Sequence, residues 1–293
     1  MAARAKVWGE AMENVRSELL ELTPRQRSEY EFHRAHAEQR RGLAEDPVVV
    51  DILDPHHRRP WNAYWSLYDR IFEAGPSGKR VLVPGSGFGD DAIRLAMLGA
   101  QVSAFDLSPE SVEIARARAA QAGYPDIDFR VMPSEAMSGY DAHSFDMVLL
   151  VDILHHVDIP STIREIARVV KPGGLIIGDE LYTHSALQWI RESAAVSKLL
   201  YPLMERWIYN GKKPYITPEE HKIDETELAI VLRVMDTCSV DFFGMAEGRL
   251  FPSHLAWASK IDRALIRLFR PAAKRLGSRV VFSGAIGSAP PVT

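Results

Sequence analysis

Short apolar runs alternate with segments of helical periodicity between residues 80 and 179. The apolar runs cover 80–84, 101–105, 127–132, 145–151 and 174–179, and the helical segments cover 89–98, 109–122 and 160–170. This alternation predicts a doubly wound α/β fold, with a mostly parallel sheet, helices on both faces and a ligand crevice at the carboxyl ends of the strands. Further along, we expect a helix at 224–235, a strand at 237–243, a helix at 254–270 and a last strand at 278–285.

Local signals mark the ends of two of these helices. Ser108-Pro109 combines a capping residue with a proline in the first turn, which is a usual start of a helix. Lys171-Pro172-Gly173-Gly174 predicts the end of the helix at 160–170, because proline cannot continue it and glycine adopts positive φ at low cost.

The chain before the alternating region predicts helices that lie over the mouth of the crevice. Residues 4–45 are rich in Arg, Glu, Gln and Ala with a loosely helical apolar spacing, so we expect one or two amphipathic helices. Trp61, Tyr64, Trp65 and Tyr68 then follow a helical spacing and form one aromatic face. This face either packs against the core, which we favour, or forms an aromatic wall of the ligand site.

A second segment outside the alternating pattern lies at residues 183–223. Its long apolar and aromatic stretches exceed the length of an ordinary crossover between two strands, so we expect a helical cap inserted over the crevice. The aromatic residues indicate either a hydrophobic substrate or simply the core of the cap itself. We therefore divide the chain into an N-terminal helical segment (1–70), a ligand-binding core (71–182), the cap (183–223) and a C-terminal completion of the sheet (224–293).

Composition narrows the functional classes. Hydrophobic residues make up 46% and charged residues 25% of the chain, as in ordinary globular proteins, and the net charge of −4 argues against a general nucleic-acid binder. The single Cys238 excludes an internal disulfide and a cysteine-based zinc site, and we expect it to be buried. The sequence has neither signal-peptide features nor an apolar run of about 20 residues, so we expect a cytoplasmic protein.

The segment Val81-Leu-Val-Pro-Gly-Ser-Gly-Phe-Gly89 predicts a strand followed by a glycine turn that holds a ligand. Gly85, Gly87 and Gly89 allow the backbone to approach a ligand closely, and Asp106 ends the next strand. A dinucleotide fingerprint would require a third glycine at position 90, where this chain has Asp90. An acidic residue at the start of the helix disfavours a pyrophosphate, so the turn indicates a nucleoside without phosphates.

Four segments in order resemble the class I S-adenosylmethionine-dependent methyltransferases. They are the glycine turn, Asp106 in Ser-Ala-Phe-Asp-Leu-Ser-Pro, the run from Phe145 to Val157, and Arg-Val-Val-Lys-Pro-Gly-Gly-Leu at 168–175. The resemblance covers residues 79–180. It implies a Rossmann-like sheet of seven strands with an antiparallel last strand, S-adenosyl-L-methionine as cofactor and S-adenosyl-L-homocysteine as its product.

The resemblance also assigns roles in cofactor binding. Asp106 is expected to bind the ribose hydroxyls, although it can also be read as a helix-capping carboxylate, and the glycine turn is expected to pass under the methionine tail. Two positions depart from the family pattern: Val83 stands where many relatives have an acid, a loss that Asp90 and Asp91 would have to offset, and Pro133 leaves Ser134 or Glu135 to contact adenine. The expected cofactor residues are Gly85, Ser86, Gly87, Gly89, Asp106, Leu107, Ser134, Glu135, Leu150, Val151 and Asp152.

Methyl transfer from a sulfonium needs alignment of the acceptor and, for a hydroxyl acceptor, a base, but no metal ion. We therefore expect no metal site, and we interpret His33 and His36 as solvated residues on a polar helix. The candidate bases follow the predicted fourth and fifth strands, with His254 as a further candidate: His155, His156, Tyr182 and His184.

Residues 260–279 form a basic segment with interleaved apolar positions. Such a segment either packs its apolar side on the sheet, which we favour, or makes peripheral contact with an anionic membrane. The main functional hypothesis is methyl transfer to a small, apolar acceptor in natural product biosynthesis, with oxygen as the favoured acceptor atom. The alternatives are an N-, C- or S-methyltransferase, or a non-catalytic protein that binds S-adenosylmethionine. The oligomeric state stays open.

Overall fold

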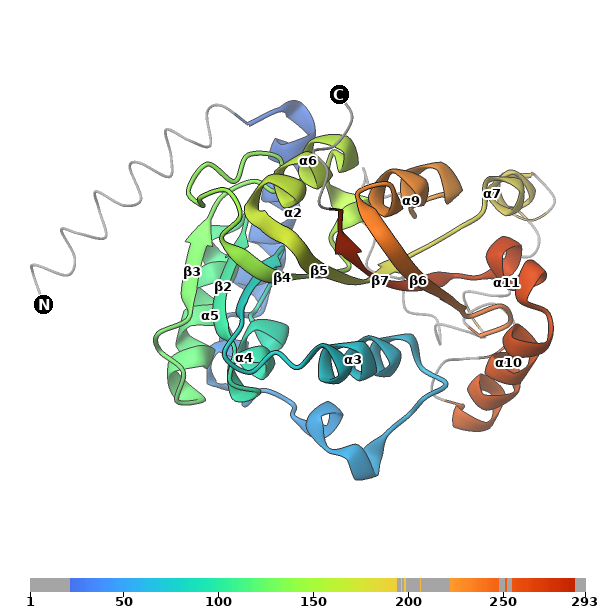
Figure 1. Cartoon of the computed structure of the whole chain (residues 1–293), viewed down its shortest axis with the longest axis horizontal. Coiled ribbons are helices and arrows are strands. Elements are labelled where there is room, and N and C mark those ends of the chain that lie inside the picture. Colours follow the sequence, from blue (N-terminus) through green and yellow to red (C-terminus); the bar gives the residue numbers. More distant parts are fainter. Residues whose placement is uncertain are drawn as a thin grey trace, which may run out of the picture.

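A seven-stranded sheet forms the centre of the molecule in a computed structural model that describes residues 22–193, 222–247 and 255–287 together with residues 196, 198, 206 and 251 (Figure 1). The strand order is β3-β2-β1-β4-β5-β7-β6. β7 runs antiparallel to β5 and β6, and the other neighbouring strands pair in parallel. This topology confirms the predicted mostly parallel sheet with an antiparallel last strand. The strands are β1 Arg80–Pro84, β2 Gln101–Asp106, β3 Asp128–Val131, β4 Phe145–Val151, β5 Val170–Leu181, β6 Met235–Phe243 and β7 Arg279–Ile286.

Helices cover both faces of the sheet, as Figure 1 shows. On one face lie α3 Ala63–Ala74, α4 Asp90–Met97 and α5 Pro109–Gln121, and on the other lie α6 Ile159–Val169 and α9 Glu225–Leu232. Side chains that alternate along each strand fill the two cores: Val81 and Val83 pack with α3, α4 and α5, whereas Leu82 packs on the side of α6 and α9. Each large apolar side chain buried in this way contributes roughly 1.5–3 kcal/mol to folding.

The remaining helices lie at the margins of the sheet. α2 Pro24–Gln39 begins with a capping box, in which Thr23 and Gln26 satisfy each other's backbone nitrogens, and the helix packs beside α5. A short 3-10 helix, η4 Leu154–His156, follows β4 directly. α7 Ser185–Glu192, α10 Ala256–Leu268 and α11 Arg270–Leu276 lie beyond β6 at the opposite end from β3 (Figure 1). No helix among the described residues is long and apolar enough to cross a membrane.

Four local predictions were wrong. Asn62 caps α3, so the helix begins at Ala63 and Trp61 lies outside it, and the buried Trp65 and Tyr68 face the core. The helix expected at 254–270 ends at Leu268, because Phe269 leaves the helical conformation and a separate helix, α11, begins at Arg270. The strand expected at 174–179 begins earlier, at Val170, with a register shift opposite Phe145 and Met147, whereas the helix before it ends at Val169, as the signal at 171–174 predicted. Cys238 is exposed.

The inserted cap predicted at 183–223 falls largely outside the described residues. Within its described part, α7 follows β5, and Ile223 forms a bridge with Tyr182. His184 caps α7 by accepting a hydrogen bond from the backbone nitrogen of Ala186 at 3.2 Å.

Candidate active site

A pocket of about 450 Å³ opens at the carboxyl ends of the central strands. Its walls come from the glycine turn after β1, the end of β2, the segment after β3, the end of β4 with η4, and one face of α2. This volume lies in the range of ordinary small-molecule sites, and the position is the one expected for a ligand in a doubly wound sheet. The predicted residues among its lining are Gly85, Ser86, Gly87, Asp106, Leu107, Ser134, Glu135, Val151, Asp152, His155 and His156.

The glycine turn is required by the backbone path and by close packing. Gly85 and Gly87 have φ of 62° and 50°, in the left-handed region that glycine adopts without strain. A Cβ at Gly85 would lie 2.4 Å from Cδ1 of Ile153, whereas a Cβ at Gly87 would meet no atom within 4 Å. The turn therefore presents bare backbone to the pocket, which is the cradle that a closely bound ligand needs.

Asp106 is anchored at the end of β2 by two backbone donors. Its Oδ2 accepts a hydrogen bond from the backbone nitrogen of Gly87 at 2.9 Å, and its Oδ1 accepts one from Ser108 at 2.9 Å. The cap of α5 is Ser108, whose hydroxyl accepts a hydrogen bond from the backbone nitrogen of Ser111 at 3.1 Å. The carboxylate therefore links the glycine turn to the β2 end and lines the pocket, and the helix-capping interpretation of Asp106 is wrong.

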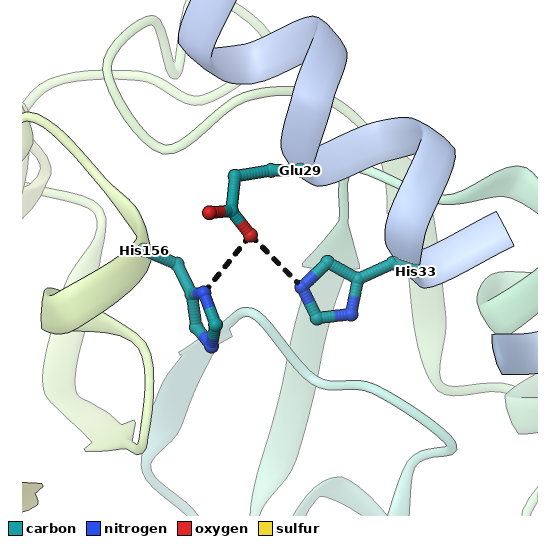
Figure 2. A group of neighbouring side chains, drawn as sticks. All are labelled: Glu29, His33 and His156. Atoms are coloured by element: carbon teal, nitrogen blue, oxygen red, sulfur yellow. Dashed lines mark hydrogen bonds and ion pairs between the residues drawn. The ribbon is translucent and has the colours of Figure 1, made fainter. Parts of the chain in front are cut away.

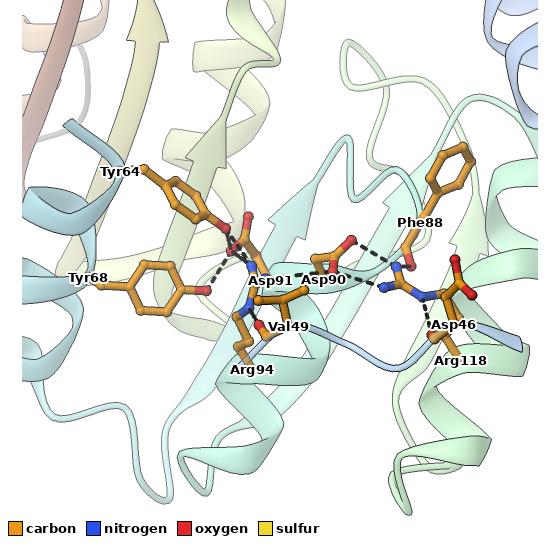
Figure 3. A network of polar contacts seen from close by, with 9 residues as sticks. All are labelled: Asp46, Val49, Tyr64, Tyr68, Phe88, Asp90, Asp91, Arg94 and Arg118. Atoms are coloured by element: carbon orange, nitrogen blue, oxygen red, sulfur yellow. Dashed lines mark hydrogen bonds and ion pairs between the residues drawn. The ribbon is translucent and has the colours of Figure 1, made fainter. Parts of the chain in front are cut away.

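Asp90 and Asp91 also line the pocket, but each carboxylate is held by groups from other helices (Figure 3). Asp90 pairs with Arg118 of α5 at 2.8 Å, and Asp91 accepts hydrogen bonds from the hydroxyls of Tyr64 and Tyr68. Burial and the Asp91 charge raise the pKa of both tyrosines, so both remain donors. These contacts attach α4 to α3 and α5.

The segment after β3 contributes one small and one charged residue. Ser134 is buried in the pocket wall. Glu135 accepts hydrogen bonds from Nε2 of Gln26 at 2.9 Å and from the backbone nitrogen of Asp158 at 3.0 Å. Glu135 therefore ties α2 to the start of α6 while it lines the pocket.

Our sequence reasoning missed the contribution of α2. Gln26, Glu29, His33 and His36 lie on one face of the helix and all line the pocket, so the interpretation of His33 and His36 as solvated residues was wrong. His36 stacks on Phe88, with ring centroids 5.7 Å apart and planes 2° from parallel, and burial lowers the pKa of His36 to about 4. The sequence did contain a signal: these four polar residues follow one another at intervals of three, four and three positions, which places them on one face of a helix.

Glu29 is shared between two imidazoles (Figure 2). Its Oε2 lies 2.9 Å from Nδ1 of His156 and 3.5 Å from Nε2 of His33. Burial alone would raise the pKa of Glu29, but the hydrogen bonds to the two histidines outweigh it and lower the pKa to about 2. Burial alone would lower the pKa of His33, but the hydrogen bond to Glu29 and the charge of Asp106 raise it above its ordinary value.

A second histidine and carboxylate pair lies beside the first. His155 contacts Glu180 through Nδ1, and both side chains are buried. The ring centroids of His155 and His156 are 4.0 Å apart. Burial alone would raise the pKa of Glu180, but His155 holds it below its ordinary value.

Although we expected no metal site, two groups of residues bring atoms that could bind a metal ion within 4.8 Å of one another. These groups are Glu29, His33 and His156, and Asp152, His155 and Glu180.

The other predicted residues lie elsewhere. Tyr182 is buried in the core, where its hydroxyl donates to the carbonyl oxygen of Lys274 at 3.0 Å. His184 caps α7 and lies 3.7 Å from Glu225. Neither lines the pocket, and Gly89 and Leu150 also lie outside its lining. His254 falls outside the described residues.

The core of the chain matches a known family. A family model described as a methyltransferase domain matches residues 82–178. The ubiquinone biosynthesis O-methyltransferase of Methylocella silvestris is 40% identical over 137 residues, which cover 46% of this chain and 53% of that protein. The protein of the same description from Xanthomonas axonopodis pv. citri is 43% identical over 100 residues, which cover 34% of this chain and 41% of that protein. The chain thus spans about half the length, or less, of these two curated relatives.

A solved structure supports the fold over most of the chain. The geranyl diphosphate C-methyltransferase of Streptomyces coelicolor A3(2) superimposes with a TM-score of 0.54 at 16% identity, and the match covers 91% of this chain and 99% of that protein. At this identity the likeness concerns the fold alone. Together with the family match, it confirms the resemblance derived from the four sequence segments.

Proposed function

We propose that the protein, whose residues 82–178 form a class I S-adenosylmethionine-dependent methyltransferase domain, transfers a methyl group from S-adenosyl-L-methionine to an oxygen atom of a small acceptor. The observation that carries the proposal is the anchored Asp106 carboxylate beside the bare glycine turn, inside the matched domain. The similarity to proteins described as O-methyltransferases supports oxygen as the acceptor atom.

The pocket residues fit this cofactor. Asp106 would accept hydrogen bonds from the ribose hydroxyls, the turn at Gly85–Gly87 would pass under the methionine tail, and Ser134 would lie near adenine. When bound, S-adenosylmethionine supplies a methyl group on a cationic sulfur, which is already activated for displacement. Val83 offers no carboxylate, and Asp90 and Asp91 are bound to groups of neighbouring helices, so the methionine tail would rely on backbone groups of the turn.

The acceptor is proposed to be a small, apolar molecule of natural product metabolism. Ile153, Val157 and Leu181 supply apolar surface in the pocket wall, and His155 and His156 lie in the same wall to accept a proton. Transfer to nitrogen, carbon or sulfur is the alternative within enzymes. A protein that binds the cofactor without turnover is the alternative outside them. Location in the cytoplasm stays a prediction.

Calorimetry with S-adenosylhomocysteine tests the binding proposal, and NAD serves as the comparison ligand. We expect binding of the first and none of the second, since Asp90 replaces the third glycine of a dinucleotide site. Incubation with methyl-deuterated S-adenosylmethionine and a panel of phenols, catechols, amines and thiols, followed by mass spectrometry, identifies the acceptor atom. Cofactor binding without any labelled product would favour the non-catalytic alternative.

Residues 260–279 were expected to pack their apolar side on the sheet, but several large apolar side chains of α10 are exposed, so the proposal includes peripheral contact of this segment with an anionic membrane. Trp257, Ile261 and Leu268 are 56%, 52% and 73% exposed and follow a helical spacing on α10, and apolar side chains that gather on one surface mark interaction sites. Exposed cations lie among them, and Asp262, the acid of this helix, is buried. An apolar and cationic helix surface suits anionic lipid headgroups.

A further inference from the structure

The cluster of Glu29, His33 and His156 brings together residues from two distant parts of the chain (Figure 2). Glu29 and His33 lie one turn apart on α2, whereas His156 lies in η4 after β4. All three line the pocket. The N-terminal helix therefore contributes charged groups to the wall that contains the candidate bases.

Glu29 is a buried carboxylate, with 2% of its surface exposed. An isolated carboxylate at such a position costs several kcal/mol, so it requires partners that donate hydrogen bonds. His156 and His33 are these partners, and the lowered pKa of Glu29, about 2, keeps it ionised across the physiological range. The carboxylate thus acts only as an acceptor toward both rings.

This arrangement determines the tautomer of His156. Because Nδ1 of His156 donates to Oε2 of Glu29 at 2.9 Å, the neutral ring carries its proton on Nδ1 and its lone pair on Nε2. In Figure 2 the two nitrogens of the ring point in different directions, one toward Glu29 and the other away from it. The available basic atom is therefore Nε2.

We propose that Glu29 and His156 form the general-base pair of the reaction, with His156 as the catalytic residue and Glu29 as its positioning residue; this rests on the proposed methyl transfer to oxygen. Nε2 of His156 accepts the proton of the acceptor hydroxyl while the oxygen forms its bond to the methyl carbon and the carbon–sulfur electron pair leaves with sulfur. The neutral ring becomes an imidazolium, which Glu29 stabilises, and the proton later passes to water.

The second pair is less suited to this role. The His155 and Glu180 side chains are 4% and 1% exposed, compared with 12% for His156. Glu180 also accepts hydrogen bonds from the backbone nitrogens of Leu154 and Leu181, which fix it to the end of β5. This pair therefore supports the turn that carries His156.

A cationic His33 would complete the cluster. Against the effect of burial, the hydrogen bond to Glu29 and the charge of Asp106 raise the pKa of His33 above its ordinary value, which stabilises its imidazolium form beside the two carboxylates. The charged and titratable groups around Glu29 and His156 are His33, Arg25, Asp106, His155 and Glu180.

Nuclear magnetic resonance of the imidazole nitrogens tests the proposal without an acceptor. In the full chain with bound S-adenosylhomocysteine, we expect neutral His156 in the Nδ1-protonated form and a pKa of His33 above 6.5 that falls in Glu29→Gln. The control variant is Glu31→Gln on the exposed side of α2, which should change neither signal. An Nε2-protonated His156 in the wild type would overturn the proposal.

Kinetics with a hydroxyl acceptor found in the labelling panel gives the second readout. His156→Gln should lower kcat by about 100-fold or more, and Glu29→Gln by at least about tenfold. Glu29→Asp should recover part of the loss, and the dissociation constant of S-adenosylhomocysteine should change less than about twofold in all variants that keep the wild-type melting temperature. Unchanged kcat in a folded Glu29→Gln would contradict the pair while leaving the proposed function intact.

Metal analysis separates the proton from the metal interpretation. We expect no stoichiometric Zn²⁺ or Co²⁺ after dialysis against either ion. A bound ion in the wild type that is lost in Glu29→Gln would overturn the proposal. A metal ion on Nδ1 of His156 leaves the ring proton on Nε2, so Nε2 then has no lone pair with which to accept a proton. Failure of the wild type to bind S-adenosylhomocysteine would instead contradict the proposed function itself.

Discussion

Oδ2 of Asp106 accepts a hydrogen bond from the backbone nitrogen of Gly87 at 2.9 Å, so the carboxylate predicted to bind ribose also holds the glycine turn. Asp106→Ala removes both the ligand contact and this hydrogen bond. We expect at least about a tenfold loss of affinity for S-adenosylhomocysteine, because hydrogen bonds to charged groups contribute about 1.5–3 kcal/mol. Calorimetry measures the loss, and exposed Asp126→Ala is the control. Equal affinities in the two variants would remove Asp106 from the site.

Gly85→Ala tests whether the turn has room for a side chain beside Ile153. The new Cβ would lie 2.4 Å from Cδ1 of Ile153 and would force alanine into a left-handed backbone conformation, which costs roughly 1–2 kcal/mol by itself. Gly87→Ala introduces a comparable conformation with no atom within 4 Å. Urea unfolding should therefore show a larger destabilisation for Gly85→Ala than for Gly87→Ala. The reverse order would show that the contact with Ile153 relaxes easily.

Protonation of Glu29 should lower the stability of the protein at acidic pH. Its folded pKa of about 2 lies below the ordinary value of 4.5, so its contribution is present above pH 4.5 and is lost as the pH falls toward 2. The difference in unfolding free energy between the wild type and Glu29→Gln should therefore shrink over this range. Chemical denaturation at several pH values measures it, and a difference independent of pH would contradict the pairing.

Tyr182→Phe should separate structural from catalytic roles. The hydroxyl donates to the carbonyl oxygen of Lys274 at 3.0 Å in the core, so its removal should cost about 1 kcal/mol of stability. S-adenosylhomocysteine affinity and turnover should stay at wild-type values, since Tyr182 does not line the pocket. A large loss of turnover with unchanged stability would return Tyr182 to the candidate bases.

Vesicle sedimentation tests the membrane proposal. We expect binding to vesicles that contain phosphatidylglycerol and weaker binding to pure phosphatidylcholine, with salt reducing the difference because it screens exposed charges. Leu268→Glu should abolish the binding, since Leu268 is 73% exposed on α10. Val49→Glu, at an exposed apolar residue on a different part of the surface, is the matched control. Equal binding of the wild type and Leu268→Glu would exclude this surface.

Local sequence signals predicted the parts of the molecule that depend on short-range chemistry. The glycine turn, Asp106 and the capping Ser108 lie within 24 positions of one another, and backbone requirements at a strand end restrict the residue types there. The alternation of apolar runs and helical segments likewise predicted the order of strands and helices in the core.

Side-chain direction explains where these local predictions stopped. Leu181 lines the pocket, whereas its neighbour Tyr182 is buried in the core, because adjacent residues along an extended chain point to opposite sides. The position of Tyr182 directly after a strand therefore made it a candidate, but it did not indicate whether the side chain points into the pocket or into the core. The same holds for His184, whose side chain caps the helix that follows instead of lining the pocket.

By itself, the sequence determined the doubly wound sheet and the residues of the glycine turn, because each depends on periodicity or on backbone demands within one segment. The cofactor class came from the resemblance of four segments to a known family. Only the tertiary structure decided that Glu29 and His33 join His156 in the pocket wall. Glu29 and His156 are 127 positions apart, and the packing of α2 beside α5 sets which face of the helix meets the pocket. A contact of this kind depends on how whole elements pack, which no local pattern encodes.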